Sequence, residues 1–358
     1  MKSRPSPRHD RPCLQPGLRR PLVLLSLCLS LVLGGFPGLV REGAAADKLI
    51  VYSGRAEKLI KPVLDAFQAK TGVQVELLSS GTTELVNRLQ AEGGRTPADV
   101  LITNDAGSLE RARELGLLQP LHLKEIDQAI APSFRAADGS WIGLSGRFWT
   151  LVYNTNLVKP GEVQSVLDLA EPRWKGKIAI PNAGSEYLQA GVSVIKVAQG
   201  DERTQKLLLG LKSNAGTFVY GKSSQIVDAL AKGEVAMGLV NHYYLYRYLA
   251  DHPGAPIAIH MLDQQDNGMG AIMNIAGAGV VKHSRHLDSA KRLMEFLVSR
   301  DGQKLFADLN KEYPLHPEVP ADPALPKRET IRTAAVPLAR LAELREPAMA
   351  MIEQAGLR

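Results

Sequence analysis

Cysteine is nearly absent from this chain, whose 358 residues contain only Cys13 and Cys28. Both lie before residue 47, so the rest of the chain can form no disulfide and offers no thiolate as a nucleophile or zinc ligand. Aromatic residues are scarce at 5%, and there is no internal repeat and no second long apolar segment. These absences exclude a disulfide-rich module, a thiol enzyme and a repeat protein.

The first 46 residues carry the features of an export signal. Basic residues extend to Arg19 and Arg20, an apolar run PLVLLSLCLSLVLGG follows, and a small-residue stretch ends at Ala46. The apolar run is short for a membrane span, with a retained N-terminal anchor as the alternative. The two arginines allow either the general secretory or the twin-arginine route. We expect cleavage near Ala46 and a soluble periplasmic protein.

The basic character of the whole chain comes from that signal. Seven of the 43 Lys and Arg residues and two of the 37 Asp and Glu residues lie in it, leaving 36 basic and 35 acidic residues. A nearly neutral mature chain gives no electrostatic reason to expect nucleic acid as a partner. The segment GTFVYGKS (216–223) matches the spacing of a phosphate-binding loop, but its middle residues are typical of a strand, so we expect no nucleotide site.

Strand and helix patterns alternate along the mature chain. The apolar runs LIVY (49–52), VQVELL (73–78) and ADVLITND (98–105) are each followed by a stretch with apolar residues at helical spacing. The same alternation returns from Trp149 onward with different residues. This pattern predicts an α/β protein with two lobes and a ligand cleft between them.

Ligands of such sheets bind at the carboxyl ends of strands, against helix N-termini. Most residues in the predicted strand-to-helix turns carry a hydroxyl or an amide or are glycine: Ser53-Gly54-Arg55, Ser79-Ser80-Gly81-Thr82, Asn104-Asp105, Ala183-Gly184-Ser185, Ser223-Ser224 and Asn241-His242. One such turn alone is more often a helix cap than a ligand site. Together they form a site only if the two lobes face each other.

Tyrosines cluster in VNHYYLYRYL (240–249), which holds Tyr243, Tyr244, Tyr246 and Tyr248. Their spacing of three and four residues suits an aromatic packing face of a helix. Alternatively, Tyr243 and Tyr244 lie in the first helical turn after a strand and both point into the cleft. A phenolate is a hard anionic ligand, and displacing its proton takes a cation of high charge density such as ferric iron.

Several segments resemble the ferric-ion-binding periplasmic proteins of ABC iron importers. The resemblance covers nearly all of the mature chain and is carried by YSGRAEKLIKPVLDAF, TPADVLITNDAGSL, GLSGRFWTLVYNT, RWKGKIAIPNAG, NKEYP and, most specifically, the tandem tyrosine in LVNHYYLYR. It implies a type II periplasmic binding protein fold and an ABC permease in the inner membrane as partner. It also implies that Tyr243 and Tyr244 bind ferric iron and that a synergistic anion, carbonate or phosphate, completes the shell.

The resemblance places the anion contacts at Gly184, Ser185, Ser223 or Ser224, and Asn241. On the other side of the cleft we add Ser80. Closure of the two lobes would bring the turn that contains Ser80 onto the tyrosines. Arg55 and Arg147 are either surface ion-pair partners or, because arginine after a glycine turn can fork onto a carboxylate or carbonate, further anion contacts.

The chain departs from this family at the first lobe. Many members carry a histidine after the first strand and a glutamate after the third, where this chain has Ala56 and Asn104 unless the alignment shifts by one to Glu57 and Asp105. Other members use a third tyrosine from the segment around Ser145 to Arg147, and none is there. The first lobe then offers iron only Glu57, Asp105, water or an anion held by Arg55 or Arg147, and among these Glu57 is the first-lobe metal candidate. We expect His242 to be an exposed first-turn residue rather than a support behind the tyrosines.

The expected organisation is lobe 1 from residues 47–148 and 272–322, lobe 2 from 149–271, and C-terminal helices in 323–358 packed on lobe 2. Segments 149–154 and 270–276 are the expected hinge strands. The chain contains no HExxH zinc motif and no complete G-x-S-x-G. We expect a monomeric transport protein without catalytic activity that captures ferric iron, and the alternative is a binder of a small organic solute such as a phosphonate, thiamine or a polyamine.

Overall fold

A computed structural model describes residues 48–159 and 161–357, and the predicted export signal lies outside these ranges. The strands form a ten-stranded sheet in which eight follow the order β2-β1-β3-β9-β4-β7-β5-β6, and the other two, β10 and β8, pair with β4. Within the described ranges, every helix is too short or too polar to cross a bilayer. The α/β class predicted from the alternating pattern is confirmed.

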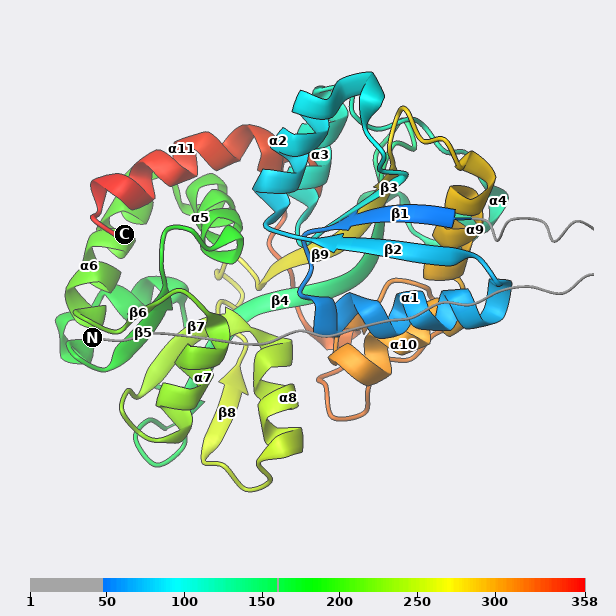
Figure 1. Cartoon of the computed structure of the whole chain (residues 1–358). Coiled ribbons are helices and arrows are strands. Elements are labelled where there is room, and N and C mark those ends of the chain that lie inside the picture. The colour runs from blue at the N-terminus through cyan, green and yellow to red at the C-terminus, as the bar shows by residue number, and fades with distance from the viewer. Residues whose placement is uncertain (1–47, 160, 358) are drawn as a thin grey trace, which may run out of the picture. The chain divides into compact units, whose positions relative to one another are not determined.

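The first half-sheet contains β1 (Lys48–Ser53), β2 (Gln74–Ser79), β3 (Val100–Thr103), β9 (Ile272–Val280), β10 (Tyr313–Pro314) and the N-terminal part of β4 (Ile142–Asn154). β1 is parallel to β2 and β3, while β9 runs antiparallel to β3 and β4. The helices around it are α1 (Glu57–Thr71), α2 (Thr82–Glu92), α3 (Ala106–Glu114), α4 (Lys124–Ala129), α9 (Leu287–Val298) and α10 (Arg300–Asn310), as Figure 1 shows.

The second half-sheet contains β5 (Ile178–Pro181), β6 (Val219–Tyr220), β7 (Met237–Asn241), β8 (Ile257–His260) and the C-terminal part of β4. β5 is parallel to β6 and β7, and both β7 and β8 are antiparallel to β4. Its helices are α5 (Glu186–Gln199), α6 (Asp201–Ala215), α7 (Ser223–Ala231) and α8 (His242–Asp251) (Figure 1).

Strand β4 is shared by both half-sheets. Its residues Ile142–Trp149 pair with β9, and its residues Trp149–Tyr153 pair with β7. Every residue of β4 is buried, as expected for a strand covered on both faces. The sequence predicted a strand only in the hinge segment 149–154, and the structure extends it back to Ile142.

Four elements differ from the predicted pattern. Helix α6 and strand β8 were not predicted. The apolar spacing in SRHLDSAKRLMEFLVSRDGQKLFADL (284–309) predicts one helix, but the structure has two, because Ser299 leaves the helical conformation and caps α10 by accepting a hydrogen bond from Gly302 N–H. The C-terminal helix α11 (Leu341–Gln354), expected on lobe 2, packs on α5 and also on α3 (Figure 1). Arg345 accounts for part of this contact, since its guanidinium donates to the hydroxyls of Ser108 and Thr83.

A buried carboxylate joins β1 to the start of α9. The Asp99 side chain is fully buried, and one of its oxygens accepts from Ile50 N–H at 2.8 Å and from His286 Nδ1 at 3.0 Å. Its other oxygen accepts from the Ser284 hydroxyl and from the N–H groups of Arg285 and His286. Asp99 thus satisfies backbone donors that the surrounding core would otherwise leave without partners.

Replacing Asp99 by asparagine is expected to lower the free energy of unfolding by about 2–3 kcal/mol. The amide keeps the shape of the carboxylate but turns an NH2 group toward N–H donors, leaving buried polar groups unpaired. Urea unfolding of the variant measures the loss. Asp288→Asn, at an exposed residue in the first turn of α9, serves as control, and an equal effect of both substitutions would contradict this role of Asp99.

Candidate metal centre

A pocket of about 580 Å³ lies between the two half-sheets. The first half-sheet lines it with residues at the N-termini of α1 and α2 and after β3, namely Gly54, Ala56, Lys58, Gly81, Thr82 and Asn104. The second half-sheet lines it with residues at the ends of β5 and at the starts of α5, α7 and α8, namely Pro181, Gly184, Ser185, Glu186, Tyr187, Gly221, Lys222, Ser223, Ser224 and Tyr244. Five of the six predicted turns therefore contribute to one pocket.

The loop after β1 and the start of α2 approach each other closely at this pocket. A Cβ atom on Gly54 would lie 2.0 Å from the Thr82 hydroxyl oxygen, so only glycine fits. The side chain of Asn104 donates to the Gly54 carbonyl at 2.5 Å. These contacts hold three turns of the first half-sheet together at one wall of the pocket.

Three tyrosines meet on the opposite wall. Tyr243 and Tyr244 lie in the first turn of α8, and their rings stack with centroids 4.6 Å apart. Tyr187, in the first turn of α5, places its hydroxyl oxygen 3.2 Å from that of Tyr243. Tyr243 is buried, while Tyr187 and Tyr244 are half-buried and line the pocket.

Burial keeps the phenols of Tyr187 and Tyr243 protonated in the absence of a cation. Desolvation raises the pKa of Tyr243 and of Tyr187 above the usual value for a phenol, and each pKa is raised further by other phenols of the group. Arg147 opposes the shift in both pKa values, and its guanidinium carbon lies 5.3 Å from the centre of the Tyr187 ring. The Nε and Nη2 atoms of Arg147 are buried without a hydrogen-bond partner. The cluster thus offers three phenol oxygens beside an arginine that lacks an anion.

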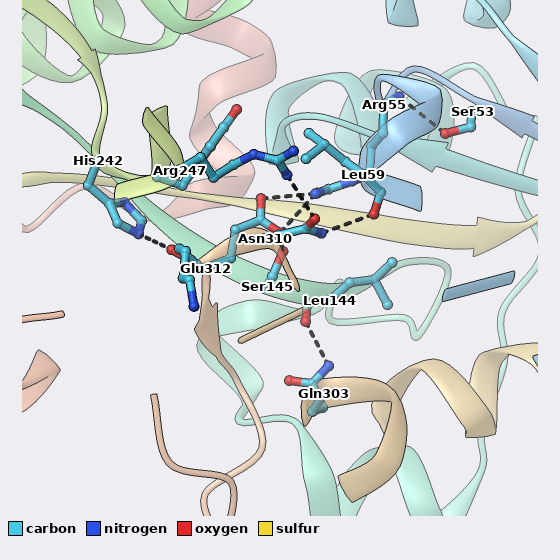
Figure 2. A network of polar contacts seen from close by, with 12 residues as sticks. Ser53, Arg55, Leu59, Leu144, Ser145, His242, Arg247, Gln303, Asn310 and Glu312 are labelled. Carbon is cyan, nitrogen blue, oxygen red and sulfur yellow. Dashed lines mark hydrogen bonds and ion pairs between the residues drawn. The ribbon is translucent and has the colours of Figure 1, made fainter. Parts of the chain in front are cut away.

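Arg55 is not a surface residue but half of a buried ion pair. Its Nη2 atom donates to both carboxylate oxygens of Glu312, at 2.8 and 2.9 Å, and the Ser145 hydroxyl donates to the same carboxylate (Figure 2). Its charge lies within electrostatic reach of Tyr187 and Tyr243. Because Glu312 already neutralises it, Arg55 supports the site from behind rather than offering a free cation to the pocket.

His242 is fully buried, and the prediction of an exposed residue was wrong. Its Nδ1 atom accepts from Phe148 N–H at 3.1 Å, so the Nε2–H group donates to the Lys311 carbonyl at 2.8 Å (Figure 2). Its ring also contacts the rings of Tyr243 and Tyr313. The neutral imidazole therefore ties the tyrosine helix α8 to β4 and to the segment before β10.

Acid is expected to destabilise the fold through His242. Desolvation lowers its pKa to about 4 from the ordinary value of 6.5. Between about pH 6.5 and pH 4 the imidazole of His242 takes up a proton in the unfolded chain but not in the folded chain. The free energy of unfolding therefore falls as the pH falls through that window, by about 3 kcal/mol in all. Chemical unfolding from pH 7 to pH 4 should show a shallower slope for His242→Gln than for the unaltered protein, whereas His252→Gln, at an exposed residue at the end of α8, should keep the slope.

The remaining predicted residues divide into two groups. Gly184, Ser185 and Ser223 line the pocket, and Asn241 is buried next to it with its Nδ2 atom unpaired. Glu57 is exposed on the first turn of α1 and is absent from the pocket lining, as is Ser80, whose hydroxyl bonds Glu84. Asp105 accepts from Ser108 N–H and Oγ as the cap of α3, so its carboxylate is not free.

Sequence reasoning missed two residues of the pocket, Glu186 and Tyr187. Both follow Ser185 in the strand-to-helix turn after β5, and this position is the signal that would have identified them. Among the residues that the structure describes, Glu186 is the only carboxylate that lines the pocket. It accepts a hydrogen bond from Thr82 Oγ1 at 3.3 Å across the pocket. Desolvation, together with the charge of Asp105, raises the pKa of Glu186 to about 7.

Within the described ranges, no three His, Cys, Asp or Glu side chains are arranged to hold a metal ion. The pocket instead offers the phenol groups of Tyr187 and Tyr244. Tyrosinate ligands select cations that compete strongly with the proton, and ferric iron is the common biological example.

Comparisons with known proteins agree with this chemistry. Residues 63–333 match the bacterial extracellular solute-binding protein family. The chain is 32% identical to iron uptake protein A1 of Synechocystis over 87% of each chain, and 30% identical to the major ferric iron-binding protein of Neisseria meningitidis over 88% of this chain and 94% of that one. Curated relatives of this kind cover most of the mature chain.

Solved structures show the same fold. Iron-bound HitA from Pseudomonas aeruginosa superposes with a TM-score of 0.81 at 29% identity, covering 87% of this chain and all of that one. A Trichodesmium FutA structure in complex with iron and citrate gives a TM-score of 0.77 at 30% identity with the same coverage. The two half-sheets are the two lobes of this fold. The chain belongs to the bacterial extracellular solute-binding proteins, and its relatives are ferric iron-binding proteins of the periplasm.

Proposed function

We propose that this protein captures ferric iron in the pocket between its lobes and delivers it to an ABC permease of the inner membrane. One observation carries the proposal: Tyr187, Tyr243 and Tyr244 converge beside the unpaired guanidinium of Arg147. The charges of three phenolates balance the charge of one ferric ion. Binding of the metal compensates for the free energy needed to deprotonate the phenols, whereas water in the pocket does not.

The remaining coordination positions would be filled by an anion. Gly184, Ser185 and Ser223 at the helix N-termini, the unpaired amide of Asn241, and Arg147 are the donors available for it. Carbonate and phosphate are the expected anions, and the Trichodesmium relative holds citrate with its iron. Tyr187 takes the place of the first-lobe ligands that this chain lacks, and Glu57 and Ser80 have no part in the site.

The same proposal covers location and organisation. An exported monomer without catalytic activity would work in the periplasm after cleavage near Ala46. Lobe 1 would contain residues 47–148 and 272–322, and lobe 2 residues 149–271, a division supported by the change of strand partners at Trp149. The hinge would lie in 149–154 and 270–276, where β4 and β9 connect the lobes.

Iron is favoured over a small organic solute as the ligand. Curated relatives at 30–32% identity carry names that specify iron, and a phenol cluster in which the oxygens of Tyr187 and Tyr243 lie 3.2 Å apart suits a cation better than an organic ring, which would need an apolar wall. A structure with bound fructose-6-phosphate is only 19% identical, so that likeness concerns the fold alone.

Absorption spectroscopy tests the proposal. Purified apo-protein is titrated with ferric iron in bicarbonate and in phosphate, and a tyrosinate-to-iron charge-transfer band should saturate at one equivalent. Acidification should bleach the band because protons compete for the phenolates. Absence of a band with every anion would remove iron as the ligand and restore the organic-solute alternative.

A further inference from the structure

The two lobes touch each other directly across the pocket. Thr82, the first residue of α2 on lobe 1, donates its hydroxyl to a carboxylate oxygen of Glu186 at 3.3 Å. Glu186 is the first residue of α5 on lobe 2 and is followed at once by Tyr187. The contact therefore joins lobe 1 to the helical turn that carries one of the three phenols.

The surroundings of Thr82 hold the donor of this bond in place. The residue is fully buried, and Gly54 packs closely against its hydroxyl. The amide of Asn104, which donates to the Gly54 carbonyl, also interacts with the Glu186 carboxylate. A donor that is already ordered loses little conformational entropy when the lobes meet, so the bond retains most of its free energy.

Helix α11 connects the same end of α2 with lobe 2. It packs on α5 and on α3 (Figure 1), and the Ser193 hydroxyl of α5 donates to the Leu344 carbonyl. The next residue, Arg345, donates to the hydroxyl of Thr83, the neighbour of Thr82, and its charge also acts on Glu186. The first turn of α2 is thus a place where lobe 1 meets elements that pack on lobe 2.

Iron that is coordinated by the lobe 2 tyrosines does not by itself draw lobe 1 in. Among the described residues, the lobe 1 lining of the pocket has no carboxylate, imidazole or phenol: Gly54, Ala56, Lys58, Gly81, Thr82 and Asn104. A ligand favours the closed form only through interactions that differ between the open and closed forms. The closed form is therefore favoured by direct contacts between the lobes and by whatever contacts the bound anion makes.

Resting on the proposed function, we propose that Glu186 is a positioning residue that fastens lobe 1 over the iron by accepting the hydrogen bond of Thr82, a contact we call the Thr82–Glu186 latch. The latch slows the release of iron rather than its capture. Iron reaches the phenols while the lobes are apart, whereas release from the closed form requires the latch to break first. Glu186 contributes no ligand to the iron in this role.

Stopped-flow absorption measures both steps. Mixing apo-protein with ferric iron in bicarbonate gives the capture rate, and mixing iron-loaded protein with an excess of a strong synthetic chelator gives the release rate. Glu186→Ala and Thr82→Val should each release iron about tenfold faster, as expected for the loss of one hydrogen bond to a charged group, with the charge-transfer band and the capture rate unchanged.

Two further variants separate the hydrogen bond from the charge of Glu186. Glu186→Gln keeps an acceptor oxygen for Thr82 and should release iron at nearly the rate of the unaltered protein. Thr82→Val/Glu186→Ala should release iron no faster than either single variant, because the two side chains share one bond. Glu84→Ala is the matched control, since this carboxylate of α2 bonds Ser80 within lobe 1 and should leave the release rate unchanged.

Small-angle X-ray scattering of the iron-loaded proteins reports closure independently. Glu186→Ala and Thr82→Val should have a larger radius of gyration than the unaltered protein and Glu84→Ala, because a greater share of their molecules is open. Unchanged release rates, or single effects that add in the double variant, would overturn the inference while the band leaves the proposed function standing. Loss of the band in Glu186→Ala alone would make Glu186 a metal ligand and contradict the latch. A missing band in the unaltered protein would refute both proposals.

Discussion

Replacing Tyr187 by phenylalanine is expected to weaken ferric iron binding by more than about a hundredfold and to reduce the charge-transfer absorbance. Removing a group that only supports a metal ligand costs about 10- to 100-fold in affinity, so removing a ligand should cost more. The substitution deletes the hydroxyl that lies 3.2 Å from that of Tyr243 and leaves the ring under Arg147. Competition with citrate, followed at the charge-transfer band, measures the affinity.

The same substitution at Tyr248, on α8, provides the control. Tyr248 stacks on His252 with ring centroids 4.2 Å apart and does not line the pocket, so Tyr248→Phe should bind iron normally. Tyr243→Phe and Tyr244→Phe should each lose affinity as Tyr187→Phe does. A Tyr187→Phe protein with normal affinity and an unchanged band would show that only two phenolates bind the metal.

Replacing Glu312 by glutamine is expected to lower the free energy of unfolding by about 3–5 kcal/mol, because it leaves the charge of a buried arginine uncompensated. The side chains of Arg55 and Glu312 are each 1% exposed, and their closest atoms are 2.8 Å apart. The glutamine also loses the charge-assisted bond from Ser145. Guanidinium chloride unfolding at pH 7 measures the change.

Two further proteins separate lost charge from lost packing. Arg55→Met/Glu312→Leu removes both charges and should recover most of the stability, because apolar residues of similar volume replace buried ion pairs at little cost. Asp65→Asn, which breaks the exposed pair with Lys61, should change stability by less than about 1 kcal/mol. If Glu312→Gln lowers the free energy of unfolding by no more than Asp65→Asn does, the buried pair does not stabilise the fold as described.

The position of a side chain at a strand end was predictable because it depends on local sequence. Apolar runs followed by Ser, Gly or Asn mark the places where strands give way to helices, and the pocket is lined from five of the six turns identified in this way. Tyr243 and Tyr244 were placed correctly in the first turn of α8. Tyr187 occupies the equivalent place in α5, and because it has no second tyrosine beside it, only its position after the turn at Ser185 could have identified it.

The pairing of distant residues could not be predicted in the same way. Arg55 and Glu312 are 257 positions apart, and which of the two arginines has an anionic partner depends on β10 lying beside β4. His242 seemed exposed because a histidine at a helix start normally is, but the return of the chain at Lys311 covers it.

By itself, the sequence determined the α/β class, the turns that carry the polar groups and the tandem tyrosine, because each of these follows from hydrophobic period and residue type within a short stretch. Only the tertiary structure decided that Tyr187 joins the phenol cluster, that Arg55 is neutralised and Arg147 is not, and that the described part of lobe 1 lines the pocket without a carboxylate, imidazole or phenol. The physical reason is that charge compensation and desolvation depend on which groups surround an atom in space, and strand order sets those neighbours across the whole length of the chain.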